Sequence, residues 1–122
     1  MTTQNNQEIE IWKNIQNYED YYQVSNLGRI KSLSRTVDKG YGIKQPVKER
    51  LLKAHPNQKG YFQVFLCKKG IRKVFTVHRL VACAFIVNPL NLHQINHISN
   101  CKTDNRVENL EWITNLDNMR HA

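Results

Sequence analysis

The apolar residues of this 122-residue chain come in short runs, the longest of which covers the eight residues 80–87. A helix that spans a bilayer needs about 20 apolar residues, so this run predicts a buried helix of a globular protein and no membrane partner. A chain of this length can build one hydrophobic core but not two independent ones. We therefore expect one compact body made of short elements, with any functional site built on it.

Neither the first residues nor the cysteines indicate an exported protein. The start, MTTQNNQEIE, has no basic stretch followed by an apolar segment, as a signal peptide would. Cys67, Cys83 and Cys101 are odd in number and contain no C-x-x-C pair, which argues against a disulfide framework. These features predict a cytoplasmic location.

Positive charge is concentrated in the middle of the chain. Residues 28–79 contain fourteen Lys or Arg and two acids, a local balance of +12, whereas the whole chain carries +8. A basic surface on a near-neutral remainder is typical of proteins that follow a phosphate backbone. The same charge also suits acidic proteins, anionic membranes or a solvated face without a partner.

Strand-like residues occupy the first half. Residues 11–15 and 21–24 combine aromatic and β-branched residues, and Gly28 ends the turn that follows. Residues 29–35 are predicted to form a strand with Arg29, Lys31 and Arg35 on one face, because alternate strand residues share a face. Residues 38–46 are rich in Gly and Lys without a clear period, and are predicted to form a loop.

The second half predicts a hairpin, a helix and a further strand pair. Residues 61–67 and 71–77 are strand-like and joined by a short Gly-containing connection. Residues 78–86 are predicted to form the buried helix, which Asn88-Pro89 ends. Residues 94–98 and 110–113 are predicted strands around a polar loop, and Thr114 is the predicted N-cap of a closing helix.

Three segments, in this order, are similar to one family. NHI at residues 96–98, KTDNRVENLEWIT at 102–114 and Asn118 resemble the HNH endonuclease motif of phage and intron-encoded homing endonucleases. VHRLVA at 77–82, followed by Ala84-Phe85, resembles the helix before that motif. Trp12-Lys13 and YQVSNLGRIKSL at 22–33 look like the nuclease-associated modular DNA-binding motif often fused to it.

The resemblance implies an α+β fold with N-terminal antiparallel β-hairpins, a helix and a C-terminal ββα-metal (His-Me finger) motif. It places a basic β-sheet DNA-binding module at residues 8–55, an HNH nuclease domain at 60–122 and the ββα-metal motif at 93–122. The implied activity is hydrolysis of phosphodiesters in double-stranded DNA, in a bacterial or phage-infected host cell. One site per monomer makes a nick the expected product, whereas a double-strand break would need a homodimer or two events.

The resemblance also assigns roles to four residues. His97 maps to the general base, a task that imidazole suits because it changes protonation near neutral pH. Asn96 and Asn118 map to the ligands of one divalent cation, for which amide oxygens favour Mg²⁺ or Mn²⁺ over zinc. Asn109 is expected to tie the loop to the first strand and orient His97. Since neighbouring strand residues diverge, a bend or bulge is expected at Asn96 and His97.

Two positions depart from the family pattern. Where relatives commonly have Asp-Gly-Asn, this chain has Ser99-Asn100-Cys101, and Asn100 is expected to adopt the left-handed conformation that Gly would supply. The ligand position, often Asp, is the neutral Asn96. An amide lacks direct charge attraction to a cation, so metal binding without DNA phosphate is expected to be weak.

Cations on the two predicted hairpins are the expected DNA contacts. Two-stranded ribbons fit the major groove, and most of these contacts are expected with phosphates. The predicted set comprises Arg29, Lys31, Arg35, Lys68, Lys69, Arg72 and Lys73.

Other interpretations of the same residues remain open. His93, His97 and Cys101 are four apart and would line one helix face as zinc ligands, although the segment is poor in helix formers. The neutral Asn96 and the altered loop also fit a catalytically inactive HNH-derived DNA-binding protein, and the charge fits an RNA-binding or structural domain. His78, at the start of the predicted helix, is expected to serve in capping or packing.

Overall fold

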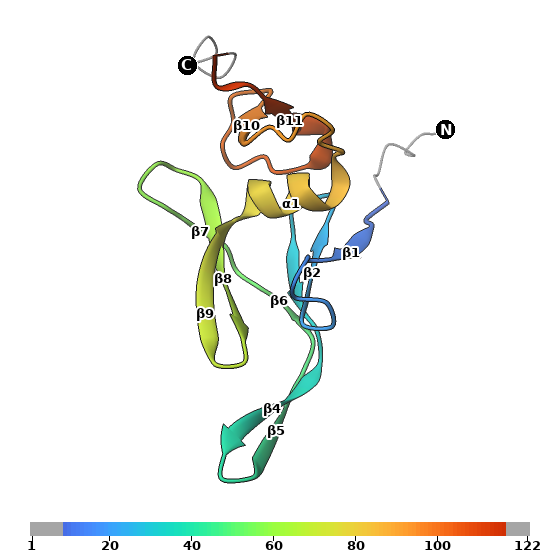
Figure 1. The fold of residues 1–122 in the computed structure, drawn as a ribbon, viewed down its shortest axis with the longest axis vertical. Coiled ribbons are helices and arrows are strands. Elements are labelled where there is room, and N and C mark those ends of the chain that lie inside the picture. Colours follow the sequence, from blue (N-terminus) through green and yellow to red (C-terminus); the bar gives the residue numbers. More distant parts are fainter. Residues whose placement is uncertain (1–8, 117–122) are drawn as a thin grey trace, which may run out of the picture.

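The computed structural model describes residues 9–116, which form four small antiparallel sheets and one α-helix (Figure 1). The largest sheet has the order β1-β2-β3-β6, with strands Trp12–Asn14, Tyr22–Ser25, Ile30–Ser32 and Arg50–Leu51. A second sheet has the order β7-β8-β9, with strands His55–Pro56, Phe62–Lys68 and Ile71–Thr76. The two-stranded sheets are β4 (Arg35–Gly40) with β5 (Ile43–Val47) and β10 (Gln94–His97) with β11 (Leu110–Ile113). The helix α1 spans Val77–Phe85, and the 3₁₀-helix η1 spans Val107–Asn109. This arrangement confirms the predicted α+β class.

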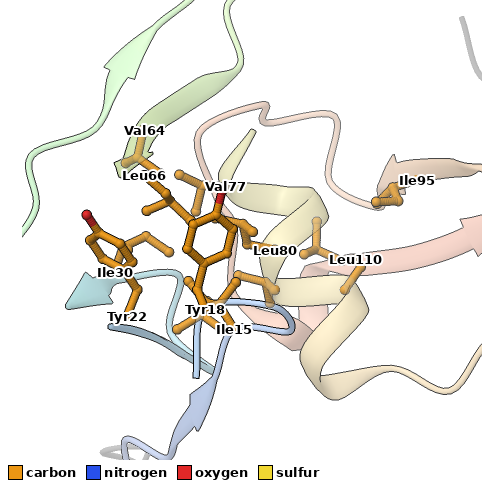
Figure 2. Close-up of a cluster of buried hydrophobic side chains, with 13 residues drawn as sticks. Ile15, Tyr18, Tyr22, Ile30, Val64, Leu66, Val77, Leu80, Ile95 and Leu110 are labelled. Carbon is orange, nitrogen blue, oxygen red and sulfur yellow. The ribbon is translucent and has the colours of Figure 1, made fainter. Parts of the chain in front are cut away.

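The core gathers around α1 (Figure 2). Val77, Leu80 and Val81 are buried on the helix, which contacts β2, β8, β9, β10, β11 and η1. Val24 in β2 and Leu66 in β8 are completely buried and belong to the same cluster. Because the first sheet, the second sheet and the C-terminal hairpin all contribute to this one cluster, their relative positions are set by shared burial of apolar surface.

The predicted strand over residues 29–35 is wrong in its second half. β3 ends at Ser32, and Arg35 begins β4 in a different sheet. The Arg35 guanidinium stabilises the turn between β3 and β4. It donates hydrogen bonds to the carbonyl oxygens of Tyr21 at 3.2 Å and Leu33 at 2.8 Å. The Arg35 guanidinium lies over the rings of Tyr21 and Tyr22. Arg29 and Lys31 instead lie over the Trp12 ring. Arg35 therefore does not share a face with the other two cations.

The predicted loop at 38–46 is also wrong, because most of it lies in the β4–β5 ribbon. Arg35 pairs with Val47 and Val37 with Gln45, and a register shift between Asp38 and Gly40 leaves a bulge. The ribbon has almost no buried apolar side chains, so its sequence lacks the alternation by which half-buried strands are predicted.

None of the helices within residues 9–116 has the length and hydropathy to cross a bilayer. The predicted helix at 78–86 and the hairpin at 61–77 agree with α1, β8 and β9 to within one residue at each end. Of the predicted closing helix, only Asn115 and Leu116 fall within the described part, where they are helical. Asn118, the second predicted metal ligand, lies outside the described residues.

Candidate active site

The C-terminal hairpin carries the predicted site. In β10 and β11, Asn96 pairs with Glu111 and His97 with Leu110. The pairing is regular, so of the expected bend or bulge at this strand end there is no bulge. The expected bend is present, directly after His97, where the Asn100 N–H donates to the His97 carbonyl at 2.8 Å. Asn100 has a φ of 66°, which confirms the predicted left-handed conformation.

Two hydrogen bonds and one ring contact join the C-terminal hairpin, with the residue that precedes it, to α1 and its C-cap Ile86. The Trp112 indole N–H donates to the Ile86 carbonyl at 3.1 Å, and the Arg79 guanidinium donates to the His93 carbonyl at 2.7 Å. Arg79 also lies over the Trp112 ring, 5.8 Å from its centroid. The strand that presents His97 is thereby held against the core and not on a mobile loop, as precise positioning of a catalytic group requires.

Asn109 closes the loop between the two strands. Its side-chain oxygen accepts the Ser99 N–H at 2.9 Å, and its amide nitrogen donates to the Asp104 carbonyl at 2.8 Å. Its own carbonyl accepts the Ile98 N–H at 2.8 Å. Arg106 hydrogen-bonds the Asp104 side chain and lowers the pKa of that carboxyl. Asn109 thus bonds the backbone on both sides of the loop and gives the segment after His97 a defined shape.

His97 is buried, and one of its ring nitrogens has a single fixed partner. Its Nε2 lies 2.8 Å from Oδ1 of Asn105, which is also buried. An amide oxygen only accepts, so Nε2 carries the proton in the neutral ring and Nδ1 is left with a free lone pair. The geometry assigns Nδ1 as the basic atom. Asn105 was not among the predicted site residues, and no local pattern distinguishes it from the other polar residues of the loop.

The turn between β2 and β3 packs against the backbone at Asn105. The Val107 N–H donates to the Asn26 carbonyl at 2.9 Å, and Gly28 lies against the Asn105 backbone. A Cβ atom on Gly28 would stand 3.0 Å from both the Cβ and the carbonyl oxygen of Asn105. Gly28 also has a φ of 88°, which L side chains rarely adopt. A glycine in the N-terminal part therefore permits the close approach that positions the partner of His97.

Replacing Gly28 with Ala is expected to lower the free energy of unfolding by about 2–3 kcal/mol, from backbone strain plus the clash with Asn105. Gly40→Ala is the matched control, because Gly40 has a φ of 95° and a Cβ atom at that position would meet nothing within 4 Å. Urea denaturation measures the free energy of unfolding of both variants. Gly28→Ala combines backbone strain with the clash, whereas Gly40→Ala has backbone strain alone. Equal losses in both would show that the approach of Gly28 to Asn105 contributes nothing.

Two further rings contact His97. The centroids of Tyr61 and His78 lie 5.7 Å and 5.0 Å from that of His97, and 4.9 Å from each other. Nδ1 of His78 is buried and has no hydrogen-bond partner among residues 9–116. Burial, followed by the charges of His97 and Arg79, lowers the pKa of His78 to about 4. His78 is therefore a neutral packing group against His97. Of its two expected roles the structure confirms packing, since the N-cap of α1 is Thr76.

The lowered pKa of His78 predicts an acid-sensitive fold. Below pH 6.5 His78 takes up a proton in the unfolded chain, whereas in the folded chain it does so only near pH 4. The free energy of unfolding therefore has its full His78 contribution above pH 6.5 and decreases as the pH falls from 6.5 toward 4. After allowance for partial solvent exposure, the loss attributable to His78 is about 2 kcal/mol. His78→Phe should retain the ring packing and remove this part of the pH dependence in urea titrations at pH 7 and 4.5. An identical pH dependence in the variant and the parent would contradict this role.

Asn96 has a carboxylate beside it. Its amide nitrogen donates to Oε2 of Glu111 at 3.3 Å, which leaves the amide oxygen as the free end. These two side chains offer hard oxygen donors of the kind that Mg²⁺ and Mn²⁺ prefer. Residues 9–116 contain no group of three His, Cys, Asp or Glu that could hold a metal by themselves. The donors present fit an open site in which water and phosphate oxygens complete the coordination. Glu111 was not predicted, although the expected strand pairing could have placed it opposite Asn96.

The zinc interpretation is excluded by the secondary structure. His97 ends a β-strand, His93 precedes it, and Cys101 lies in the loop beyond, where its thiol is exposed. The three side chains therefore do not line one face of a helix.

Some of the predicted DNA-contact cations already interact with other groups of the protein, and others are exposed. Arg29 forms a two-point ion pair with Glu10, and Lys31 lies 4.2 Å from the centroid of the Trp12 ring. Lys68 donates to the Asn17 carbonyl at 2.6 Å. On the β8–β9 hairpin, Lys69, Arg72 and Lys73 are exposed, and Arg72 lies over the Phe65 ring at 3.8 Å.

The antiparallel strand pair that ends in the buried His97, with oxygen donors on Asn96 and Glu111, agrees with the expected resemblance to HNH nucleases. Comparisons with known proteins agree. Residues 10–67 match the NUMOD4 motif. The chain is 40% identical over 128 residues to "Uncharacterized HNH endonuclease L247" of Acanthamoeba polyphaga mimivirus, a match that covers 100% of this chain and 28% of that protein.

A phage protein and its solved structure give the same result. The chain is 34% identical over 110 residues to "DNA endonuclease I-HmuI" of Bacillus phage SP01, which covers 90% of this chain and 56% of that one. The structure described as DNA binding and cleavage by the HNH homing endonuclease I-HmuI superposes with a TM-score of 0.72 over 91% of this chain and 56% of that chain. These findings confirm the resemblance to HNH homing endonucleases. The chain spans between 28% and 56% of the length of these relatives.

Proposed function

We propose that this chain is a metal-dependent DNA endonuclease that hydrolyses phosphodiester bonds, with His97 as the general base. The observation that carries the proposal is the buried hydrogen bond from His97 Nε2 to Asn105, which leaves Nδ1 free to accept a proton from water. A histidine whose second nitrogen is fixed in this way has a defined tautomer and ring orientation, as a general base requires.

Asn96 and Asn118 are the proposed ligands of one Mg²⁺ or Mn²⁺ ion. When bound, such a cation neutralises charge on the scissile phosphate and on the departing oxygen. Glu111 turns the Asn96 amide so that its oxygen faces away from the carboxylate, and it adds the negative charge that the amide lacks. Asn109 and Asn105 hold the loop and the His97 ring. Tyr61 and His78 cover that ring and limit its rotation.

Duplex DNA is the proposed substrate, contacted through phosphates by the seven predicted cations. Lys69, Arg72 and Lys73 are the strongest candidates because they are exposed on one hairpin, whereas Arg35 is engaged within the fold. Each monomer is proposed to make one nick per event, in the cytoplasm of a bacterial or phage-infected host cell. The relatives' names support the substrate class, since one is a DNA endonuclease and two are HNH endonucleases.

Metal binding should depend on Glu111. Glu111→Ala is expected to raise the Mg²⁺ concentration needed for half-maximal cleavage by about 10-fold, in line with the loss of a partner that orients a ligand. Glu111→Gln, which keeps the shape and removes the charge, separates orientation from attraction. Calorimetric titration of Mg²⁺ into the free parent should detect only weak binding, and tight stoichiometric binding would contradict a site completed by phosphate.

The proposed function is tested with supercoiled plasmid and the full chain in Mg²⁺ or Mn²⁺, with a chelated control. Appearance of open circles before linear DNA supports a nicking endonuclease, and linear DNA from the outset would contradict single-strand cleavage. The alternative is an inactive HNH-derived DNA-binding protein, which the neutral Asn96 and the altered loop at Ser99 to Cys101 favour. Binding without cleavage, on plasmid and on phage or host DNA alike, would establish that alternative.

A further inference from the structure

The loop of residues 98–106, which follows His97, carries a cation that the proposed function does not use. Lys102 is exposed, and no carboxylate of residues 9–116 forms an ion pair with it. Arg106, the other cation of this loop, is paired with Asp104. The charge of Lys102 is therefore available to an anionic ligand close to the catalytic base.

Two contacts hold the Lys102 ammonium in place. It donates to the Lys59 carbonyl at 2.8 Å and lies 5.0 Å from the centroid of the Tyr61 ring. The aliphatic stem runs beside Gly60, where a Cβ atom would stand 3.5 Å from Cδ of Lys102. An ammonium has three donors, so two N–H groups remain for a ligand. Because the side chain is already ordered, a ligand loses less affinity to conformational entropy than it would with a free lysine.

The Tyr61 ring links this ammonium to the catalytic base. Tyr61 stacks on His97 with 5.7 Å between the ring centroids and 25° between the ring planes. The ammonium therefore lies no farther from the centre of the His97 ring than its own distance to Tyr61 and this stacking distance added together. Successive phosphates of one DNA strand advance by about 3.4 Å along the helix axis. A strand whose scissile phosphate lies at His97 thus has neighbouring phosphates within reach of Lys102.

We propose that Lys102 binds a phosphate of the strand that is cut, close to the scissile bond, and thereby positions that bond against His97. Tyr61 keeps the ammonium and the imidazole at a fixed separation. This inference rests on the proposed function, because it assumes that the chain binds and nicks DNA. Lys102 differs from the seven predicted DNA contacts in one respect. Its loss should slow cleavage of bound DNA as well as weaken binding, because small displacements of reacting groups are costly.

The experiment measures the maximal nicking rate of the full chain on supercoiled plasmid in Mg²⁺, and the salt dependence of its binding to a duplex without metal. Lys102→Ala is expected to lower the maximal rate about 10-fold, because the strand is no longer fixed relative to the base. The salt slope of binding should flatten by about one ion. Lys102→Arg keeps the charge and should recover most of the lost activity. Thermal unfolding of both variants should match the parent, since the side chain is exposed.

Lys44→Ala is the matched control for removal of one positive charge. Lys44 is also exposed and has a polar partner, Asp38 at 3.2 Å. It lies in β5, in the ribbon that extends away from α1 and the other sheets (Figure 1). Lys44→Ala should therefore nick at the parent's maximal rate. Equal losses in Lys44→Ala and Lys102→Ala would show an effect of net charge and overturn the assignment.

The role of Tyr61 is tested by a double-mutant cycle. In a Tyr61→Leu background the ammonium has lost its ring contact, so Lys102→Ala should lower the maximal rate by a smaller factor than in the parent. A ring that serves only in packing would leave the two effects independent. Losses that simply multiply would remove Tyr61 from the positioning of Lys102.

The two parts of the proposal have separate contradicting results. A parent-like maximal rate in Lys102→Ala, or no recovery in Lys102→Arg, would overturn the positioning role. A parent-like salt slope in Lys102→Ala would overturn the phosphate contact. Failure of the proposed function is a different result, in which the parent binds DNA without cutting it. The salt slope then still decides whether Lys102 contacts a phosphate.

Discussion

Replacing His97 with Ala is expected to lower the rate of DNA nicking by about 10²- to 10⁴-fold, the usual contribution of a positioned general base. His97 is 5% exposed and contacts Asn105, Tyr61 and His78. Truncation to Ala therefore removes both the base and the ring that these three residues contact. DNA affinity should be unchanged, because the cations proposed to bind phosphate lie on other elements. The measurement is the initial rate of open-circle formation, made at protein concentrations that saturate the plasmid.

His97→Gln is the matched control for loss of ring packing. It fills much of the space and can still donate to Asn105, but it cannot accept a proton from water at neutral pH. Both variants should therefore show the same large loss of nicking rate, while thermal unfolding shows that they are folded. A His97→Gln protein that nicks at the parent's rate would remove His97 from the role of base.

Asn105 is expected to show the second largest effect. Asn105→Leu has a similar volume but offers no acceptor to His97 Nε2, so the ring loses its fixed tautomer and the buried N–H is left unpaired. Nicking should fall about 100-fold, and stability should fall by about 1–3 kcal/mol from the lost hydrogen bond. Initial rates on plasmid and urea titrations measure the two effects.

Asn105→Asp separates these effects, because a carboxylate also accepts from Nε2. This variant should retain most of the nicking activity, since the proton stays on Nε2 and Nδ1 remains free. Comparable losses of activity in Asn105→Leu and Asn105→Asp would contradict a role through the tautomer of His97. Their stabilities should be compared at the same pH, because the added carboxylate lies close to His97.

The elements predicted well are those whose signals are local. The apolar pattern of residues 78–86 places α1, and the short Gly-containing connection Lys68-Lys69-Gly70 places the β8–β9 hairpin. The left-handed conformation of Asn100 follows from its own side chain, which tolerates positive φ better than most. These features depend on residues that are close together in the sequence, so the sequence alone is enough to predict them.

The features that were missed depend on contacts between distant segments. Asn105 reaches His97 because Gly28, 77 positions earlier, lets the first sheet approach the loop. Tyr61, directly before β8, and His78, in α1, meet His97 through contacts between segments that are far apart in the chain. Glu111 lies beside Asn96 through strand register, which could have been derived from the predicted pairing of the two strands.

Errors in the first half have a different cause. The β4–β5 ribbon is nearly all exposed, so no burial pattern distinguishes it from a loop. Strand alternation predicts Arg35 on one face with Arg29 and Lys31, but Arg35 begins a strand of another sheet and its guanidinium binds backbone carbonyls. Strand alternation alone does not reveal such contacts between a side chain and the backbone of another strand.

In the proposed function, His97 acts through Nδ1 while Asn105 holds the proton on Nε2. The most direct test is ¹⁵N-detected NMR of the imidazole in the free, full-length chain, recorded where the ring is neutral, with Asn105→Leu for comparison. The expected result is a single tautomer protonated at Nε2 in the parent and a mixture of tautomers in the variant. A parent ring protonated at Nδ1 would contradict the assignment, because the proposed basic atom would then have no lone pair to accept a proton from water.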